Sequence, residues 1–216
     1  MKIPRVTIAI AATAIAIALS PTLQALLVLD RGAVASGQLW RVATGSFVHF
    51  SLSHLLYDLL VVVAAGSILE RGGRAIGGAV VASAVAIGLA VLLLEPALSG
   101  YGGLSGIAYT LIVMLALAPP ATSGLTRPAG ATLLLLAAAK LWWEWRSGSL
   151  LLVADAGAAV RAVPLAHLVG GCVGGYWAFT GSSSRSWKSK LKSVSGDTAS
   201  IFARSTAPPG VSEKVT

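Results

Sequence analysis

Six long apolar runs, separated by short polar segments, are the feature that most constrains what this chain can fold into. They cover about residues 6–28, 52–69, 75–94, 104–118, 129–143 and 163–180. A helix needs roughly 20 apolar residues to cross the hydrocarbon core of a bilayer. Only 11% of the residues are charged, against about 25% in a soluble domain. The pattern predicts an all-α membrane protein, a bundle of six transmembrane helices.

The first run also has features of a secretory signal peptide. Lys2 and Arg5 precede it, and an Ala-Leu-Ser-Pro stretch lies near residue 20. However, the apolar run continues through Leu29, which is longer than the hydrophobic part of a typical signal peptide. We therefore expect a retained membrane helix.

The distribution of positive charge predicts the orientation. If the N-terminus is inside, the inner segments hold Lys2, Arg5, Arg71, Arg74, Arg127 and the basic residues of 185–192. The outer segments then hold only Arg31, Arg41, Arg146 and Arg161. Because cytoplasmic loops carry the excess of Lys and Arg, both termini are expected in the cytoplasm. The net charge of +8 is thus explained by topology and does not indicate a nucleic-acid partner.

The chain divides into a membrane domain over residues 1–181 and a basic, Ser-rich tail over residues 182–216. The tail lacks the apolar content to form a core and is expected to be disordered. Its basic residues can bind anionic lipid headgroups, or they can act only to set the orientation of the chain in the membrane. Residues 30–51 are too polar to span and too apolar for a free loop, so we expect them to lie in the interface or pack on the bundle. Cys172 has no cysteine partner in the chain.

Ionisable groups inside spans are costly, which makes each one a functional candidate. Ser105 follows Gly102 and Gly103 and is expected in the first turn of the fourth span. The unpaired N–H groups of a first turn favour negative charge and suit an oxyanion beside a serine. Small residues packed between helices would produce the same Gly-x-Ser-Gly pattern.

His167 lies in the sixth span, ahead of a Gly170-x-x-x-Gly174 pair that permits close contact with a neighbouring helix. If that neighbour is the fourth span, His167 can reach Ser105. A histidine near a span end can instead contact interfacial water. Tyr109 follows Ser105 by one turn and could stack on a histidine ring, or be an ordinary core tyrosine.

His54 and Asp58 begin the second span with a spacing of four, which places both on one helix face. They can form a structural pair, a metal site or polar support for chemistry. We expect no metal and no cofactor, because the other histidines are only His49 and His167 and no cluster of carboxylates or thiolates accompanies them.

Together these residues resemble the rhomboid family of intramembrane serine proteases over about residues 35 to 180. Trp40-Arg41 is similar to the family's motif in the first outer loop, and His49, His54 and Asp58 resemble the start of its second helix. The segment 103–106 with Tyr109 resembles the catalytic serine motif, and Ala166-His167 with the two glycines resembles the catalytic histidine helix.

The resemblance implies Ser105 as nucleophile and His167 as base, with an oxyanion held by the Ser105 N–H and His54. The Leu104 backbone and Asp58 are further candidates for oxyanion support. The family commonly has asparagine at Asp58, and an ionised aspartate cannot donate a hydrogen bond. Asp58 is therefore expected to be protonated or to orient His54. No acidic residue in the sequence is suited to a third position beside His167.

The short form, Asp58 and the run over residues 163–171 also resemble the bacterial rhombosortases. That resemblance implies a multi-pass protein of the bacterial inner membrane whose partners are membrane-anchored substrates with a C-terminal Gly-Gly sorting tail. A cavity open to the outer side is expected to supply water. A non-catalytic rhomboid-like protein that binds transmembrane helices is the alternative. A transporter ranks last, because the ionisable groups gather near outer span ends.

Overall fold

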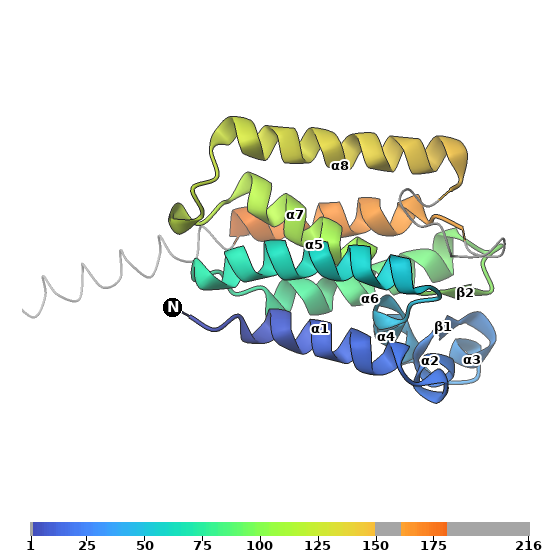
Figure 1. Cartoon of the computed structure of the whole chain (residues 1–216). Coiled ribbons are helices and arrows are strands. Elements are labelled where there is room, and N and C mark those ends of the chain that lie inside the picture. The colour runs from blue at the N-terminus through green and yellow to red at the C-terminus, as the bar shows by residue number, and fades with distance from the viewer. Residues whose placement is uncertain (1, 150–160, 181–216) are drawn as a thin grey trace, which may run out of the picture. The chain divides into compact units, whose positions relative to one another are not determined.

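A helix lies in each of the six apolar runs in the computed structural model, which describes residues 2–149 and 161–180 (Figure 1). These helices are α1 (Arg5–Ala18), α5 (Leu52–Arg71), α6 (Gly77–Leu94), α7 (Ser105–Leu117), α8 (Arg127–Ser147) and an unlabelled helix over residues 164–180. Figure 1 shows their long axes running roughly alongside one another. Each predicted run thus contains a helix, although the first run is broken, and the predicted tail over residues 182–216 lies outside the described residues.

Not every one of these helices has the length and composition of a membrane span. Among the described residues, α5 and α6 are each long and apolar enough, and α1 with α2 (Pro21–Leu27) would make a third, bent span. α7 is apolar but has 13 residues, and α8 carries Arg127, Lys140, Glu144 and Arg146. The described helices thus give two to three candidate spans, and six crossings remain a prediction.

The first apolar run is not one straight helix, so the expected span over residues 6–28 needs correction. α1 ends at Ala18, and α2 leaves it at an angle of 110°. Pro21 disfavours helical backbone at the residue before it. Ser20 is extended, and its side chain accepts a hydrogen bond from the Leu23 N–H at 3.3 Å to cap α2. Hydropathy alone does not register this break.

The segment between α1 and α5 packs on one end of the bundle, as expected. It contains α2, β1 (Leu29–Asp30), α3 (Arg31–Ala35), α4 (Arg41–Thr44) and the 3₁₀ turn η1 (Gly45–Phe47). Buried Arg41 donates to the carbonyls of Ala25 and Val28, each at 2.8 Å. Arg31 donates to the Leu92 and Glu95 carbonyls at 2.7 and 3.0 Å. Two arginines therefore satisfy backbone carbonyls at helix ends.

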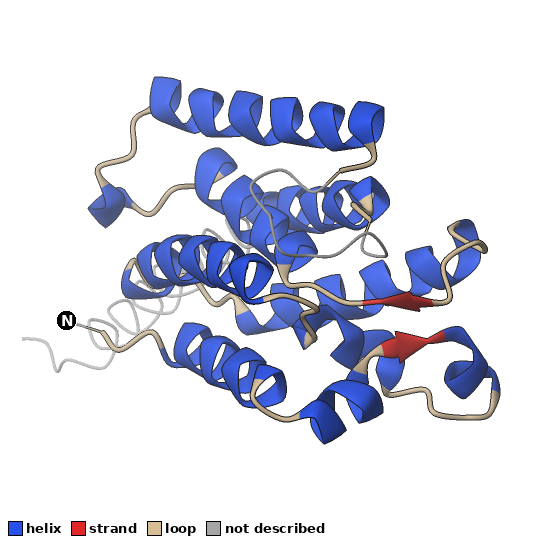
Figure 2. Cartoon of the chain, turned by 45° about the vertical axis from the view of Figure 1, so that its right-hand side comes forward, coloured by secondary structure: helices blue, strands red, loops and turns tan. Residues whose placement is uncertain are grey.

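A two-stranded sheet ties this segment to the residues before α7. β1 pairs antiparallel with β2 (Gly100–Tyr101), with Leu29 opposite Tyr101, and Figure 2 shows the two strands in red. On the far side of α7, the turn η2 (Ala121–Ser123) leads into α8. The pairing fixes where the chain enters α7, and it was not predicted because two residues carry no periodicity.

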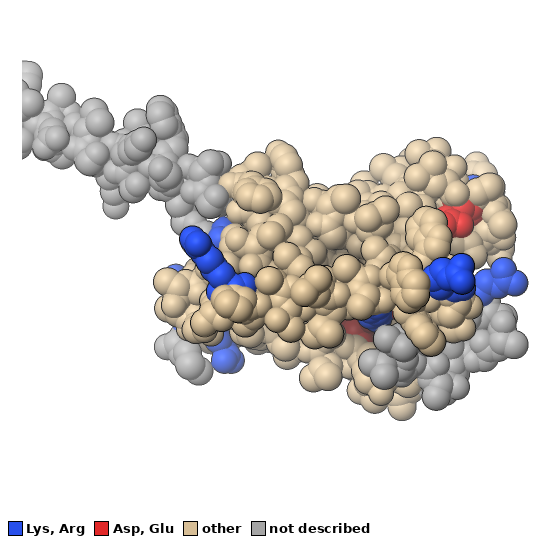
Figure 3. Space-filling model, turned by 90° about the horizontal axis from the view of Figure 1, so that it is seen from above, with Lys and Arg blue, Asp and Glu red and all other residues tan. Residues whose placement is uncertain are grey.

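The outer surface of the helices is apolar. Large side chains at least 60% exposed include Leu60, Leu93, Leu94, Leu135, Leu136 and Phe179. In Figure 3, Lys and Arg gather toward the two ends, and most of the face between them is uncharged. Soluble monomers rarely expose such contiguous apolar area. The surface is that of helices facing lipid.

The helix over residues 164–180 lies directly against α7. A Cβ on Gly170 would lie 2.0 Å from the Gly106 carbonyl oxygen, and one on Gly174 would lie 2.4 Å from the Thr110 oxygen. The Thr110 hydroxyl donates to the Gly170 oxygen at 2.9 Å. The glycine pair of the sixth run therefore packs on the fourth, the neighbour on which the predicted contact between Ser105 and His167 depended.

We expect Gly174→Ala to lower the free energy of unfolding by about 1–3 kcal/mol, because a methyl group there meets backbone that cannot move aside. Gly175 has no atom within 4 Å of its Cβ position and supplies a matched control. Gly175→Ala should be neutral or slightly stabilising, since alanine favours a helix over glycine. Thermal unfolding in detergent compares the two, and equal midpoints would contradict the tight contact.

Candidate active site

The approach to Ser105 is a short, fixed piece of backbone. Burial raises the pKa of the Tyr101 phenol, and the nearby Asp58 charge adds to this. The neutral phenol donates to the Gly103 oxygen at 3.3 Å. Gly103 has a φ of +142°, and a Cβ on it would lie 3.0 Å from the His54 ring and 3.7 Å from Ser105 Oγ. Glycine at this position therefore lets His54 and Ser105 flank the same face of the backbone.

Ser105 is the first residue of α7, where the sequence predicted it. Its N–H belongs to the first turn, which has no carbonyl of the same helix to bond to. Its side chain is half-buried, and the hydroxyl makes no hydrogen bond to another described residue. Within the described part of the chain, Ser105 thus has an N–H outside the helix ladder and a hydroxyl without a hydrogen bond.

His167 is buried, at 2% exposed, beside the start of α7. A Cβ on Gly106 would lie 2.9 Å from the Ala166 oxygen, so the residues next to Ser105 and His167 touch through backbone. The Tyr109 and His167 rings stack with centroids 4.6 Å apart and an angle of 5° between their planes. Ser105 and His167 are thus neighbours without a preformed hydrogen bond, which is common in free enzymes because such bonds tighten on substrate binding.

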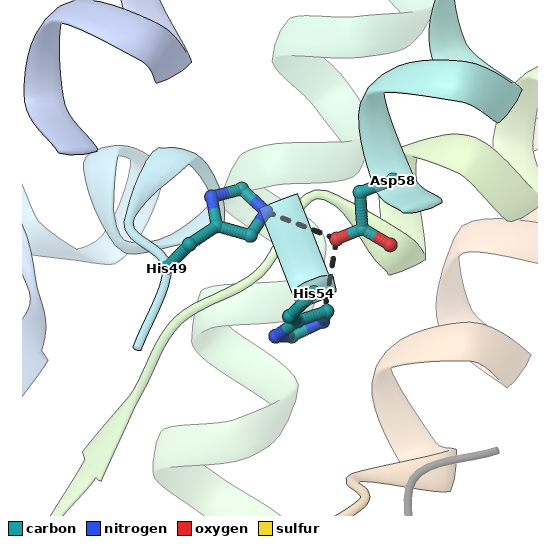
Figure 4. A group of neighbouring side chains, drawn as sticks. All are labelled: His49, His54 and Asp58. Carbon is teal, nitrogen blue, oxygen red and sulfur yellow. Dashed lines mark hydrogen bonds and ion pairs between the residues drawn. The ribbon is translucent and has the colours of Figure 1, made fainter. Parts of the chain in front are cut away.

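His49, His54 and Asp58 form a buried cluster next to this site (Figure 4). Asp58 Oδ2 lies 3.0 Å from His49 Nε2 and 3.3 Å from His54 Nε2. An ionised Asp58 can accept from His49 only if Nε2 carries a hydrogen. If Nε2 instead accepts from the Leu104 N–H, the same contact needs a protonated Asp58 that donates to it. In either state the carboxyl group orients the two imidazoles, which favours the orienting role over direct contact with an oxyanion.

The cluster also bears on two further expectations. Its ligand atoms lie within 4.8 Å of one another, so His49 joins the pair of His54 and Asp58 in a group that could hold a metal ion. Zinc accepts such ligands, but the Leu104 N–H points at His49 Nε2 from 3.3 Å. A donor aimed at that nitrogen fits a hydrogen-bonded cluster better than a metal ligand. The same contact turns the Leu104 N–H toward His49 and away from the role of oxyanion donor.

One polar residue at the site was missed in the sequence. Glu144 of α8 is fully buried, and its Oε2 lies 2.8 Å from His167 Nδ1. Its Oε1 lies 2.5 Å from Lys140 Nζ. The expectation that no acidic residue suits a third position is therefore corrected. The available signal was a Lys-x-x-x-Glu pair at the end of an apolar run, where ionisable groups are costly.

Two cavities adjoin β2. One of about 550 Å³ is lined by residues that include Glu144, Gly148, Pro164 and Leu165. The other, of about 320 Å³, is lined by His54, Gly102 and their neighbours. Both include Ser99 and Gly100 in their walls. Within the described residues, space for water therefore adjoins His54 and Glu144, whereas neither Ser105 nor His167 is among the lining residues.

Comparison with known protein families gives a match over most of the chain. A family model described as a rhomboid domain matches residues 36–184, which is more than half of the chain. No curated protein matches the chain. The matched range runs from the segment before Trp40 to beyond the described part of the helix that carries His167.

The stacking partner of His167 can be tested with two variants. Tyr109→Phe keeps the ring and loses only the hydrogen bond from the phenol to the Ala137 oxygen at 2.9 Å, so it should lower stability by about 1 kcal/mol. Its serine should react with a fluorophosphonate at nearly the wild-type rate. Tyr109→Leu removes the stacked ring and should slow labelling by up to about tenfold. Equal rates for the two variants would show that the ring does not hold the imidazole.

Proposed function

Because the chain belongs to the rhomboid family, whose members are typically intramembrane serine proteases, we propose that it is a serine endopeptidase acting on membrane-anchored proteins. Ser105 is the nucleophile and His167 is its base. The observation that carries the proposal is the backbone contact between α7 and the helix over residues 164–180, with the Tyr109 and His167 rings stacked beside it. This contact makes the serine and the histidine neighbours within an apolar bundle.

The chemistry follows from these positions. His167 takes the proton of the Ser105 hydroxyl as Oγ attacks a peptide carbonyl, and the tetrahedral oxyanion receives hydrogen bonds from the Ser105 N–H and from His54. When the C–N bond breaks, His167 gives its proton to the leaving amine. A water then attacks the acyl ester, with His167 again the base. Asp58 and His49 hold the His54 ring through the contacts described above.

The proposed topology places this site near the outer face. The rhomboid domain and the apolar helices make the chain a multi-pass membrane protein. With six crossings and the N-terminus inside, α1 runs outward, the segment over residues 19–51 lies outside, and α7 starts from the outer side. Both termini are then cytoplasmic, in the inner membrane of a bacterium. The positive charge distribution supports this orientation.

For the substrate we propose proteins with a C-terminal Gly-Gly sorting tail, as cleaved by rhombosortases. A helical peptide bond is closed to attack, so small helix-breaking residues near a membrane anchor suit the mechanism. Asp58 in place of asparagine, the compact form and the run over residues 163–171 support this narrower assignment. If Ser105 is unreactive, the alternative function is a non-catalytic protein that binds transmembrane helices.

We expect Ser105→Ala and His167→Ala each to abolish cleavage, by several orders of magnitude, because the residues of a catalytic pair act as a unit. Neither variant should unfold the protein. Ser123→Ala, in the turn between α7 and α8, is the matched control and should cleave normally. Residual cleavage by either purified, folded variant would defeat the mechanism.

The rate should also depend on pH. We expect cleavage to fall as the pH drops from about 8 to about 5, because a protonated His167 cannot accept the serine proton. A rate profile of the purified enzyme in detergent checks this. A flat profile over that range would contradict the assignment of His167 as base.

The substrate class is tested by co-expression with a reporter that ends in a Gly-Gly, hydrophobic and basic tail. We expect wild type to remove the tail and Ser105→Ala to leave it intact. If the reporter stays uncut while a fluorophosphonate still labels Ser105, the proposal of a serine protease is retained and this substrate class is rejected. If there is neither cut nor label, the non-catalytic helix binder replaces the proposal.

A further inference from the structure

α8 buries little of itself. Among its residues only Gly130 and Glu144 are buried. The three tryptophans around Glu144 are exposed, at 65% for Trp142, 49% for Trp143 and 67% for Trp145. Burying a carboxylate is costly unless it is paired. A fully buried glutamate on an otherwise exposed helix therefore needs a specific partner.

The partner is the His167 imidazole. Three groups on one face of α8 meet the Tyr109–His167 pair: the Ala137 carbonyl, Lys140 and Glu144, spaced at i, i+3 and i+7. The Ala137 oxygen accepts from the Tyr109 hydroxyl, and Lys140 Nζ lies 5.7 Å from the centre of the Tyr109 ring. Glu144 Oε2 lies 2.8 Å from His167 Nδ1, which is within ion-pair distance but without the alignment of a formed hydrogen bond. Glu144 is the only buried charged residue of α8, and it contacts the histidine of the proposed pair.

The contact sets the state of the imidazole. A carboxylate beside Nδ1 favours the tautomer with its hydrogen on Nδ1, which leaves Nε2 as the acceptor of the ring. It also stabilises the imidazolium that forms when the ring takes the serine proton. Lys140, at 2.5 Å from Oε1, keeps the carboxylate paired while Oε2 serves the histidine.

We propose that Glu144 is a positioning residue that completes a Ser105–His167–Glu144 triad, in an enzyme whose family resemblance implies only the serine and the histidine. The inference rests on the proposed protease function. The competing explanation is that Lys140 alone is the ion-pair partner of Glu144 and that the carboxylate only packs beside the histidine. The two differ in what happens to the reactivity of Ser105 when the carboxylate is removed.

The pH dependence distinguishes these explanations. Titratable groups face His167 from three helices: Tyr109 on α7, Lys140 and Glu144 on α8, and His54 on α5. Removing the Glu144 charge makes the imidazolium less stable, so protonation then requires a lower pH. Removing the Lys140 charge should act in the opposite direction, because a cation opposes the imidazolium. If Glu144 pairs only with Lys140 and does not act on the imidazole, neither profile moves.

The experiment measures the rate of Ser105 labelling by a fluorophosphonate against pH, in the purified full-length protein in detergent. We expect Glu144→Gln to slow labelling at neutral pH by about 10- to 1,000-fold, less than the roughly 10,000-fold found for the equivalent change in a soluble serine protease. The acid limb should shift to lower pH. Glu144→Asp, which retains the charge, should recover part of the rate and the wild-type limb.

Glu70→Gln is the matched control. Glu70 accepts from the Val6 and Thr7 N–H groups at 3.1 and 2.7 Å at the start of α1, so its loss should lower thermal stability and leave the labelling profile unchanged. If Glu144→Gln does not fold, Lys140→Met supplies the test through an acid limb shifted to higher pH.

Each outcome either supports or overturns the positioning role of Glu144. Slower labelling of folded Glu144→Gln with a displaced acid limb establishes the positioning role. Wild-type rate and profile in folded Glu144→Gln, or in Lys140→Met if only that variant folds, would overturn the triad and leave the Ser105–His167 protease intact. Wild type that does not label at all removes the proposed function, and the triad with it.

Discussion

The close contact of α7 with the helix over residues 164–180 is the constraint on which the rest of the structure depends. At Gly170 and Gly174 the two backbones approach so closely that no side chain fits between them. Without a hydrophobic drive between helices in lipid, such packing and the hydrogen bonds it allows supply the association. The Thr110 hydroxyl bonds to the Gly170 oxygen and lies 2.6 Å from the Ser83 hydroxyl of α6, so three helices meet at this point.

The site follows from that contact. Ser105 stands at the start of one helix, where its N–H is free, and His167 stands one turn before Gly170 on the other. Tyr109 covers one face of the imidazole, and Glu144 meets its edge. The polar groups of the bundle are paired in the same way elsewhere. Glu70 of α5, for example, accepts from the Thr7 N–H and hydroxyl at the start of α1. A charged side chain is buried inside the bundle only where a partner compensates for the loss of solvation.

The sequence predicted the helices well because apolar runs have a direct physical cause. It predicted the start of α7 at Ser105 and the stacking of Tyr109 on His167, since both follow from spacing along one helix or from a family pattern. It missed the 110° bend after Ala18, although Ser20-Pro21 is a recognisable break. A hydropathy window averages across that break.

The contacts between distant segments were harder to predict. The pairing of Leu29 with Tyr101 involves two residues on each side and leaves no periodic signal. Lys140 and Glu144 read as an ordinary surface pair on a helix, and nothing in their spacing points to His167. The distance between Glu144 and His167 is set by the packing of α8 on α7, which only the structure provides.

The most direct test of the central claim is to map the site of a fluorophosphonate adduct on the wild-type protein in its native membrane by peptide mass analysis. If Ser105 and His167 act as a pair, we expect a single adduct on Ser105 that disappears when His167 is replaced by alanine. An adduct on another serine, or on Ser105 regardless of His167, would contradict the pairing that the contact between α7 and the helix over residues 164–180 creates.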